Sequence, residues 1–278
     1  MLGKRADGFH ELCTIFQTIS LHDTLHFDDA DELSLSCEGP AVATDANNLI
    51  LKAALLLQGT LSTKPGAAIR LEKSIPFPGG LGGGSSNAAV TLVALSQLWN
   101  LEGVDLHSLA VELGSDVPFF LHGGTAMGSG RGEIIEPVDD REEHNLLIVA
   151  PEISISTADV FGSLSAPTLT KKGLDNNLTV CRKDAENFDP RHSVLKNDLE
   201  PGVFAKYPEV ERVKNTLLEL GAVNAAMSGS GASVFAIFDK QETRQTAIDA
   251  LATTRSWRKF AVSTVSRDEY RREVLGIA

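Results

Sequence analysis

The sequence has few of the residues that zinc-binding, disulfide-rich and nucleic-acid-binding proteins depend on. Its 3 cysteines in 278 residues (Cys13, Cys37 and Cys181) are scattered, without metal-ligand spacing, which argues against structural zinc and implies no disulfide. Its 25 basic residues against 37 acidic ones give a formal net charge of -12. A surface of this sign does not bind nucleic acid through phosphate neutralisation, so we expect no nucleic-acid partner.

Long apolar runs and a secretory leader are also lacking. Uninterrupted apolar runs such as residues 146–150 are far shorter than the roughly 20 residues of a membrane-spanning helix. The N-terminus has no apolar core of a signal peptide. We therefore expect a cytoplasmic protein without membrane contact. An anionic substrate would have to be held by local backbone N–H groups and a few cations, because the global field is negative.

The order of the expected elements predicts an α+β fold with antiparallel sheets and helices on one side. The opening residues 2–10 are polar and glycine-marked, and we interpret them as a loop. The stretch 161–198 is polar and irregular, so we place a boundary between two halves near it and expect domains at 1–150 and 151–278. Periodicity predicts strands at 14–19, 25–27, 33–37, 68–72, 146–150, 233–238 and 259–265, and helices at 48–57, 88–99, 105–114, 209–220 and 242–251.

A glycine-rich segment is the strongest functional signal. A strand precedes it and a periodic helix follows it, which a flexible linker would not normally show. Glycine lets the backbone approach a ligand closely, and a helix N-terminus offers unpaired N–H groups and partial positive charge. The pattern predicts a phosphate cradle, in which a serine hydroxyl binds phosphate oxygens or Mg²⁺. The segment consists of Pro78, Gly79, Gly80, Leu81, Gly82, Gly83, Gly84, Ser85 and Ser86.

Three common nucleotide-binding signatures do not fit this segment. It is not a Walker A loop, because no Lys-Ser or Lys-Thr follows the glycines. It is not a dinucleotide-binding fingerprint, because Ser85 stands where a third glycine is required. The catalytic signatures of protein kinases are absent as well.

Asp116 has two interpretations from the residues alone. It follows the helix that is expected to begin at Asp105 and end at Gly114, and it precedes Val117 and Pro118. A carboxylate held there could orient an attacking hydroxyl and accept its proton. An aspartate before a helical turn that begins with Val-Pro is equally a common N-cap. Both interpretations of Asp116, catalytic base and helix cap, stay open at this point.

The glycine segment, extended to Asn87, resembles the ATP-binding motif of the GHMP kinases. Residues 3–12, 113–118 and 197–201 resemble the members of that superfamily that phosphorylate a cytidyl-diphosphate sugar alcohol on the non-mevalonate route to isoprenoids. The resemblance covers essentially the whole chain. It implies a ribosomal-S5-like N-terminal half, a ferredoxin-like C-terminal half, an active site between them, ATP and Mg²⁺ as cofactors, and a monomer or weak homodimer.

The resemblance also implies roles for particular residues. Asp116 matches the family's catalytic base, and Phe9, His10 and Phe161 match positions that hold the cytidine. The alternative for any single Phe or His is core packing. Further implied contacts are Pro76, Phe77 and Asn48 at the ATP site, and Gly229, Ser230 and Gly231 as a second wall of the site, although these glycines could equally form a plain tight turn. The Mg²⁺ ligands are not implied.

One expected segment is missing from the match. The family has a strand with a Pro-Ala-Lys pattern before residues 3–12, and its lysine partners the catalytic aspartate; this chain starts at Met1. We expect either a truncated start or a natural loss that weakens phosphoryl transfer. The alternatives to the leading interpretation are therefore another GHMP kinase, such as homoserine kinase, and a catalytically impaired nucleotide-binding homologue.

Overall fold

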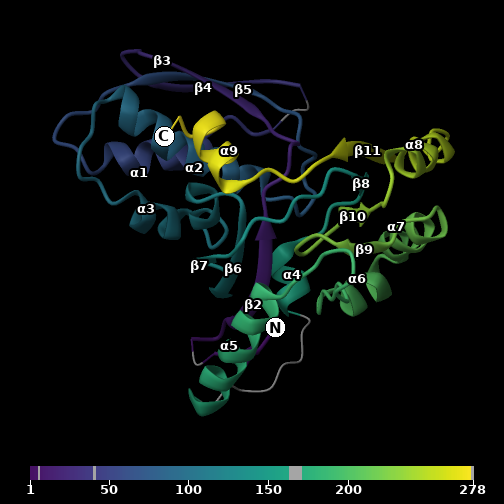
Figure 1. The fold of residues 1–278 in the computed structure, drawn as a ribbon. Helices are drawn as coiled ribbons and strands as arrows, with labels where there is room; N and C mark the ends of the chain where they lie inside the picture. The colour runs from purple at the N-terminus through teal and green to yellow at the C-terminus, as the bar shows by residue number, and fades with distance from the viewer. Residues whose placement is uncertain (6, 40–41, 163–170, 277–278) are drawn as a thin grey trace.

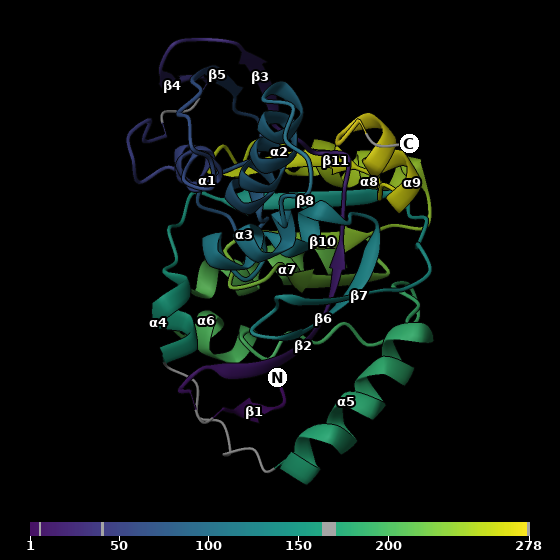
Figure 2. The same cartoon turned by 90° about the vertical axis from the view of Figure 1, so that its left-hand side faces the viewer.

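The sheets of the protein lie in two regions of the molecule. A computed structural model describes residues 1–5, 7–39, 42–162 and 171–276, with the backbone alone for 171–176. Two sheets and the helices beside them, from residues before 140, occupy one region, and the four-stranded sheet of the C-terminal half with its helices occupies the other (Figure 1). Figure 2 shows the same arrangement turned by 90°. The α+β fold is confirmed.

The N-terminal region contains two sheets. One has the order β1(Gly3–Lys4), β2(His10–Gln17), β6(Thr125–Gly130) and β7(Ile134–Pro137), all antiparallel. The other has the order β3(Thr24–Asp28), β5(Ala67–Glu72) and β4(Leu33–Glu38), in which β4 and β5 are parallel. Alternate residues of β4 are exposed, as its period-two pattern predicts.

Helices fill the space beside these sheets. They are α1(Leu49–Gln58), α2(Gly83–Leu98), α3(Leu106–Leu113) and the 3-10 turn η1(Pro118–Leu121). Asp105 caps α3 by accepting the Ser108 N–H at 3.1 Å, as expected. The core joins α1 and α2 to β5 through fully buried residues such as Leu57 and Leu92. The start of α2 is thereby fixed against the sheet, which matters for the glycine segment that precedes it.

The C-terminal sheet is antiparallel and has the order β11(Trp257–Val262), β8(Leu146–Pro151), β10(Val234–Ile237) and β9(Asn224–Met227). α6(Glu200–Lys206) and α7(Pro208–Glu219) precede β9, and α8(Gln241–Ala250) connects β10 to β11. This order is the ferredoxin-like one. The division at residue 150 stays a prediction, although the pairing of β8 with β10 and β11 favours a boundary before Leu146.

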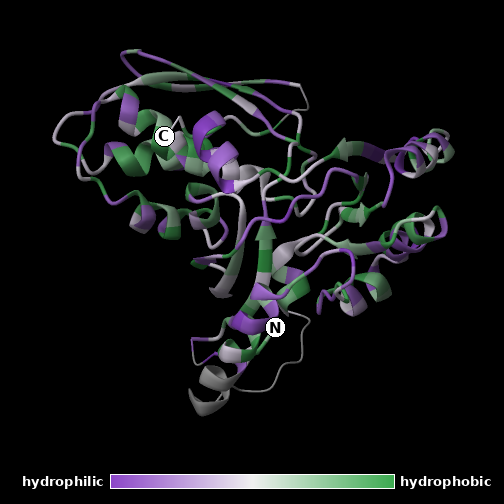
Figure 3. Cartoon of the chain, viewed as in Figure 1, coloured by the Kyte–Doolittle hydropathy of each residue, from purple (hydrophilic) through white to green (hydrophobic). Residues whose placement is uncertain are grey.

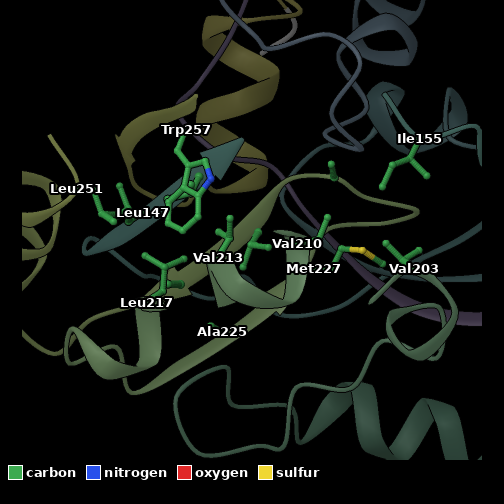
Figure 4. Packing of buried hydrophobic residues seen from close by; sticks show 14 of the residues in the cluster. Leu147, Ile155, Val203, Val210, Val213, Leu217, Ala225, Met227, Leu251 and Trp257 are labelled. Atoms are coloured by element: carbon green, nitrogen blue, oxygen red, sulfur yellow. The ribbon is translucent and has the colours of Figure 1, made fainter. Parts of the chain in front are cut away.

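The C-terminal core forms where α7 packs on the sheet. Val210, Val213 and Leu217, which the helical spacing assigns to one face, are all 0% exposed. They meet Leu147 and Trp257 in one cluster (Figure 4). The opposite side of α7 carries polar residues, and hydrophilic and hydrophobic residues alternate along its ribbon (Figure 3). Burial of one stripe therefore positions α7.

The expectation of an irregular stretch at 161–198 is wrong. It contains the end of α4(Thr157–Gly162) and the long helix α5(Lys171–Glu186). α5 is polar on most of its length, and its apolar spacing at Leu174, Leu178, Cys181 and Ala185 consists of few and partly small residues, so the helix was overlooked. Arg182 of α5 donates to both oxygens of Glu136 at 2.8 Å, which attaches the helix to β7.

The cysteine expectation also needs correction. Cys13 of β2 and Cys181 of α5 form a disulfide, with their Cα atoms 6.3 Å apart. Their separation of 168 positions gave no spacing signal in the sequence. The opening is likewise more ordered than a loop, because β1 lies within it and β2 starts at His10 rather than at residue 14.

The last helix returns to the N-terminal region. α9(Arg267–Glu273) was not expected from the sequence, and its Tyr270 packs with Val93 of α2. The Tyr270 hydroxyl donates to the carbonyl of Phe120 at 2.9 Å. In the part of the chain that the structure describes, no helix has the length and apolar character that a membrane crossing requires.

We expect Leu92→Ala to lower the free energy of unfolding by about 2–5 kcal/mol, because it leaves a cavity between α2 and β5. Leu92 is 0% exposed. Leu55→Ala on α1 is the matched control, since Leu55 is 48% exposed, and it should cost about 0.5 kcal/mol. Urea unfolding measures both; equal losses would contradict the assignment of the core.

Candidate active site

The glycine segment forms an open turn between β5 and α2. Gly80 and Gly82 have φ values of +70° and +68°, in the region that favours glycine. Gly82 is the residue before the first turn of α2, which begins at Gly83. Pro78, Gly80 and Gly84 are exposed, so the segment is not packed shut beneath other atoms.

Most backbone N–H groups of this segment have no partner among the described residues, whereas the Ser86 N–H donates to the carbonyl of Gly82 at 2.8 Å. Within the described chain, none of the N–H groups from Gly79 to Ser85 donates to another protein atom. The carbonyls are engaged instead: Gly79 accepts the Ser233 N–H at 3.1 Å, and Gly80 accepts the Ser228 hydroxyl at 2.9 Å. Free donors at a helix N-terminus form a site for an anion. The segment therefore fits the phosphates of a nucleotide.

A second glycine turn, residues 228–231 after β9, supports the first. A Cβ added to Gly80 would lie 2.6 Å from the carbonyl oxygens of both Ser228 and Gly231. Only glycine allows this approach, so Gly229, Ser230 and Gly231 border the cradle. Asn197 holds their turn by donating to the carbonyls of Met227 at 2.9 Å and Gly229 at 2.8 Å.

Asp116 lies in the turn between α3 and η1. The alternative of a helix cap is wrong, because Val117 is the N-cap of η1 and no side chain caps it. Asp116 forms no hydrogen bond or ion pair within the described residues. A Cβ at Gly132 would lie 3.5 Å from its Oδ1, so the β6–β7 turn borders the carboxylate.

The surroundings of Asp116 raise the pKa of its carboxyl group. The side chain is open to solvent, but protein surrounds it on several sides. This partial desolvation raises the pKa of the Asp116 carboxyl above its ordinary value. Since solvent still reaches the carboxylate, the rise is smaller than complete burial would produce. A carboxylate that is unpaired and more basic than usual suits proton acceptance.

The Asp116 turn lies beside the glycine segment. A Cβ at Gly82 would lie 2.9 Å from Cζ of Phe120, which belongs to η1. The hydroxyl of Tyr270 holds the same residue through its carbonyl. The phosphate cradle and the Asp116 turn are therefore in direct contact through Gly82 and Phe120.

Three aromatic residues gather at the start of β2. The rings of His10 and Phe161, from β2 and α4, have centroids 6.1 Å apart and an interplanar angle of 36°. His10 Nε2 is inaccessible and has no hydrogen-bond partner among the described residues. Phe9 is 54% exposed, and the Arg131 guanidinium lies 5.1 Å from its ring centroid. The exposed ring of Phe9 suits contact with a nucleobase. His10 Nε2 is closed off from solvent in this arrangement, and the role of His10 stays a prediction.

Within the described residues, the other residues expected at the ATP site form no hydrogen bond with the glycine segment. Asn48 caps α1 by accepting the Ile50 N–H and donates to the carbonyl of Ala43, so its amide is already engaged. The neighbouring Leu49 reaches the cradle, since a Cβ at Gly84 would lie 3.4 Å from its Cδ1. Phe77 is 73% exposed, whereas Pro76 is buried. The roles of these residues stay predictions.

The sequence analysis missed residues that hold the site together. Arg131 pairs with Glu133 at 3.6 Å and also lies over the ring of Phe9. Asn197 was noted only as part of the resemblance. No cluster of three His, Cys, Asp or Glu side chains is placed for a metal in the described chain. Two shallow hollows, near Asn100 and Asp105 and near Glu142 and Phe188, contain none of the predicted site residues.

Comparisons with known proteins agree with this arrangement. Residues 48–124 match the family model of the GHMP kinases N terminal domain, and residues 180–255 match that of the GHMP kinases C terminal domain. The chain is 38% identical to the 4-diphosphocytidyl-2-C-methyl-D-erythritol kinase of Thermodesulfovibrio yellowstonii over 89% of this chain and 88% of that protein. It is 42% identical to the kinase of the same name from Pelotomaculum thermopropionicum over 89% and 88%.

Solved structures show the same likeness. A crystal structure of 4-(cytidine 5'-diphospho)-2C-methyl-D-erythritol kinase superimposes with a TM-score of 0.74 at 32% identity, covering 95% of both chains. A homoserine kinase from Cytophaga hutchinsonii superimposes with a TM-score of 0.67 at 21% identity, covering 92% of this chain and 95% of the other. The second likeness concerns the fold alone.

We expect Gly80→Ala to weaken nucleotide binding, because the added methyl group separates the two glycine turns. Gly103→Ala is the matched control, since Gly103 has a φ of +71° but no atom within 4 Å of an added Cβ. Both substitutions carry a backbone cost of about 1–3 kcal/mol. Calorimetric titration with ATP distinguishes them, and equal ATP affinities would contradict the contact between the turns.

Proposed function

The chain belongs to the 4-diphosphocytidyl-2-C-methyl-D-erythritol kinase family of the GHMP kinases, and from this premise we propose how its residues perform the reaction. It is an ATP-dependent kinase that phosphorylates a small molecule. The substrate that we assign is 4-diphosphocytidyl-2-C-methyl-D-erythritol, phosphorylated on its 2-hydroxyl. The observation that carries the proposal is the row of unpartnered N–H groups from Gly79 to Ser85 beside the Asp116 turn.

The cradle binds the phosphates of ATP in this proposal. Its N–H groups and the N-terminus of α2 offset the negative charge, which the acidic chain as a whole does not do. When bound, Mg²⁺ would have the hydroxyl of Ser85 or Ser86 as a protein ligand, and it would supply charge neutralisation for the phosphoryl group.

Asp116 acts on the substrate hydroxyl. Its unpaired carboxylate orients the hydroxyl and accepts the proton as the oxygen attacks. Phe9, His10 and Phe161 hold the cytosine by ring contacts and by a hydrogen bond with the His10 imidazole, whose Nε2 must become accessible when the base binds. Gly229, Ser230 and Gly231 keep the substrate side of the cradle in place. We further propose that the protein acts in the cytoplasm as a monomer or weak homodimer.

Substrate choice tests the assignment. We expect the full natural chain with MgATP to release ADP when 4-diphosphocytidyl-2-C-methyl-D-erythritol is added, and to release none above background with homoserine. The aromatic residues at the start of β2 are the reason for this preference, because a small amino acid has no nucleobase to contact them. ADP release with homoserine alone would overturn the assignment. ATP binding without turnover on either compound would identify an impaired homologue.

Asp116→Asn should lower kcat by about 10²–10⁴-fold and leave the ATP dissociation constant nearly unchanged, because it removes the proton acceptor without altering the cradle. Asp105→Asn is the control: it makes the same change at the nearby cap of α3, where the amide oxygen can still accept the Ser108 N–H, and its kcat should stay close to that of the unsubstituted protein. Steady-state kinetics and calorimetry measure these constants. Unchanged turnover in Asp116→Asn would remove this residue from the mechanism.

The pH profile follows from the same carboxylate. Because the pKa of Asp116 is raised, the group becomes protonated at a higher pH than an ordinary aspartate. Activity should therefore be complete above this pKa and fall as the pH decreases through it. The measurement is kcat/KM for the sugar alcohol at saturating ATP between pH 4 and 8, and an acid limb no higher than that of an ordinary aspartate, near a pKa of about 3.9, would contradict the proposed role.

A further inference from the structure

Asp23 is a buried carboxylate to which neither the sequence pattern nor the proposed reaction assigns a role. It lies between β2 and β3, and its side chain is 0% exposed. Lys73, which follows β5, is 5% exposed and places its Nζ 2.8 Å from Oδ2 and 3.1 Å from Oδ1 of Asp23. A charge removed from water in this way needs a complete set of partners.

The remaining partners of Asp23 come from both ends of the glycine segment. Oδ1 accepts the N–H groups of Ser74 and Ile75, each at 2.8 Å. Oδ2 accepts the side-chain amide of Asn87 at 2.9 Å. Lys73 Nζ also donates to the carbonyl of Ile75 at 2.6 Å. Ile75 directly precedes Pro76, and Asn87 directly follows Ser86, so one carboxylate joins the two ends of the segment.

This junction compensates for the freedom of the glycines. Glycine has the largest conformational freedom of any residue, and a loop that orders only when its ligand arrives loses affinity by the cost of that ordering. The contacts of Gly79 and Gly80 with the second glycine turn fix the middle of the segment. Asp23 fixes its ends, because Ser74 and Ile75 continue from β5 and Asn87 belongs to the first turns of α2.

We propose that Asp23 is a positioning residue for ATP, which sets the separation and direction of the two ends of residues 76–86 before the nucleotide binds. The inference rests on the proposed binding of ATP phosphates by this segment. Asp23 touches neither ATP nor the sugar alcohol. Its loss should therefore affect the ATP constants and leave the KM of the second substrate unchanged.

Asp23→Asn is the primary test. The amide keeps the size of the side chain, but its NH₂ group faces the donors of Lys73 and Asn87, so the attachment of α2 is lost. We expect the ATP dissociation constant and the KM for ATP to rise about tenfold, the change that loss of one hydrogen bond to a charged group produces. We expect kcat to change less than about threefold, and the KM for 4-diphosphocytidyl-2-C-methyl-D-erythritol to stay constant.

Asn87→Ala is the second variant, and it keeps the Asp23–Lys73 pair intact. It removes only the hydrogen bond from Asn87 of α2 to Asp23. It should therefore raise the KM for ATP by a smaller factor than Asp23→Asn does. In the double variant the two effects should add incompletely, because both substitutions release the same attachment. If Asp23→Asn does not fold, Asn87→Ala decides the question alone: an unchanged ATP constant overturns the inference.

Glu143→Gln is the matched control for loss of a buried ion pair. Glu143 is 5% exposed and binds Arg191 at 2.7 Å, without hydrogen bonds to the glycine segment or its ends. It should lower the melting temperature but leave the KM for ATP within about twofold. Equal ATP constants for Asp23→Asn and Glu143→Gln would overturn the inference while leaving the proposed function intact. Failure of the unsubstituted protein to bind ATP would instead overturn the proposed function.

Discussion

The active site depends on backbone N–H groups that the protein leaves unpaired. A buried or half-buried N–H group normally finds a partner, and between Gly79 and Ser85 these groups have none among the described residues. The carbonyls of Gly79 and Gly80 are engaged by Ser233 and Ser228, so this part of the segment presents its donors toward an anion that approaches it. In an acidic chain this local arrangement supplies the positive potential that the side chains do not.

The two halves of the chain build this arrangement together. The N-terminal half supplies the glycine segment and Asp116, and the second glycine turn after β9 contributes the oxygens against which Gly80 packs. Asn197 and Glu200 hold that turn, since Glu200 accepts the Met227 N–H at 2.9 Å. Both residues belong to segment 197–201, one of the segments that resemble the family. Their contacts explain what this segment does in the structure: it fixes the turn that shapes the cradle.

The sequence predicted the elements whose signals are local. The cap at Asp105, the stripe of α7 and the glycine segment before α2 were expected, because capping chemistry, 3.6-residue periodicity and consecutive glycines are visible in a single stretch. α5 was missed because polar residues dominate its stretch and obscure the apolar spacing of Leu174, Leu178, Cys181 and Ala185. β6 was missed because its glycines and serine are poor strand formers that pairing with β2 stabilises. The Cys13–Cys181 pair and the Asp23 junction join residues far apart in the chain, so no spacing pattern could indicate them.

The central claim is that the free amides of Gly79–Ser85 bind the phosphates of ATP. The most direct measurement is a ¹H–¹⁵N correlation spectrum of the labelled protein, titrated with a non-hydrolysable ATP analogue and Mg²⁺. The amide resonances of these residues should show the largest shifts, which inorganic phosphate at high concentration should partly reproduce. A saturating analogue that shifts other amides and leaves these unmoved would contradict the account.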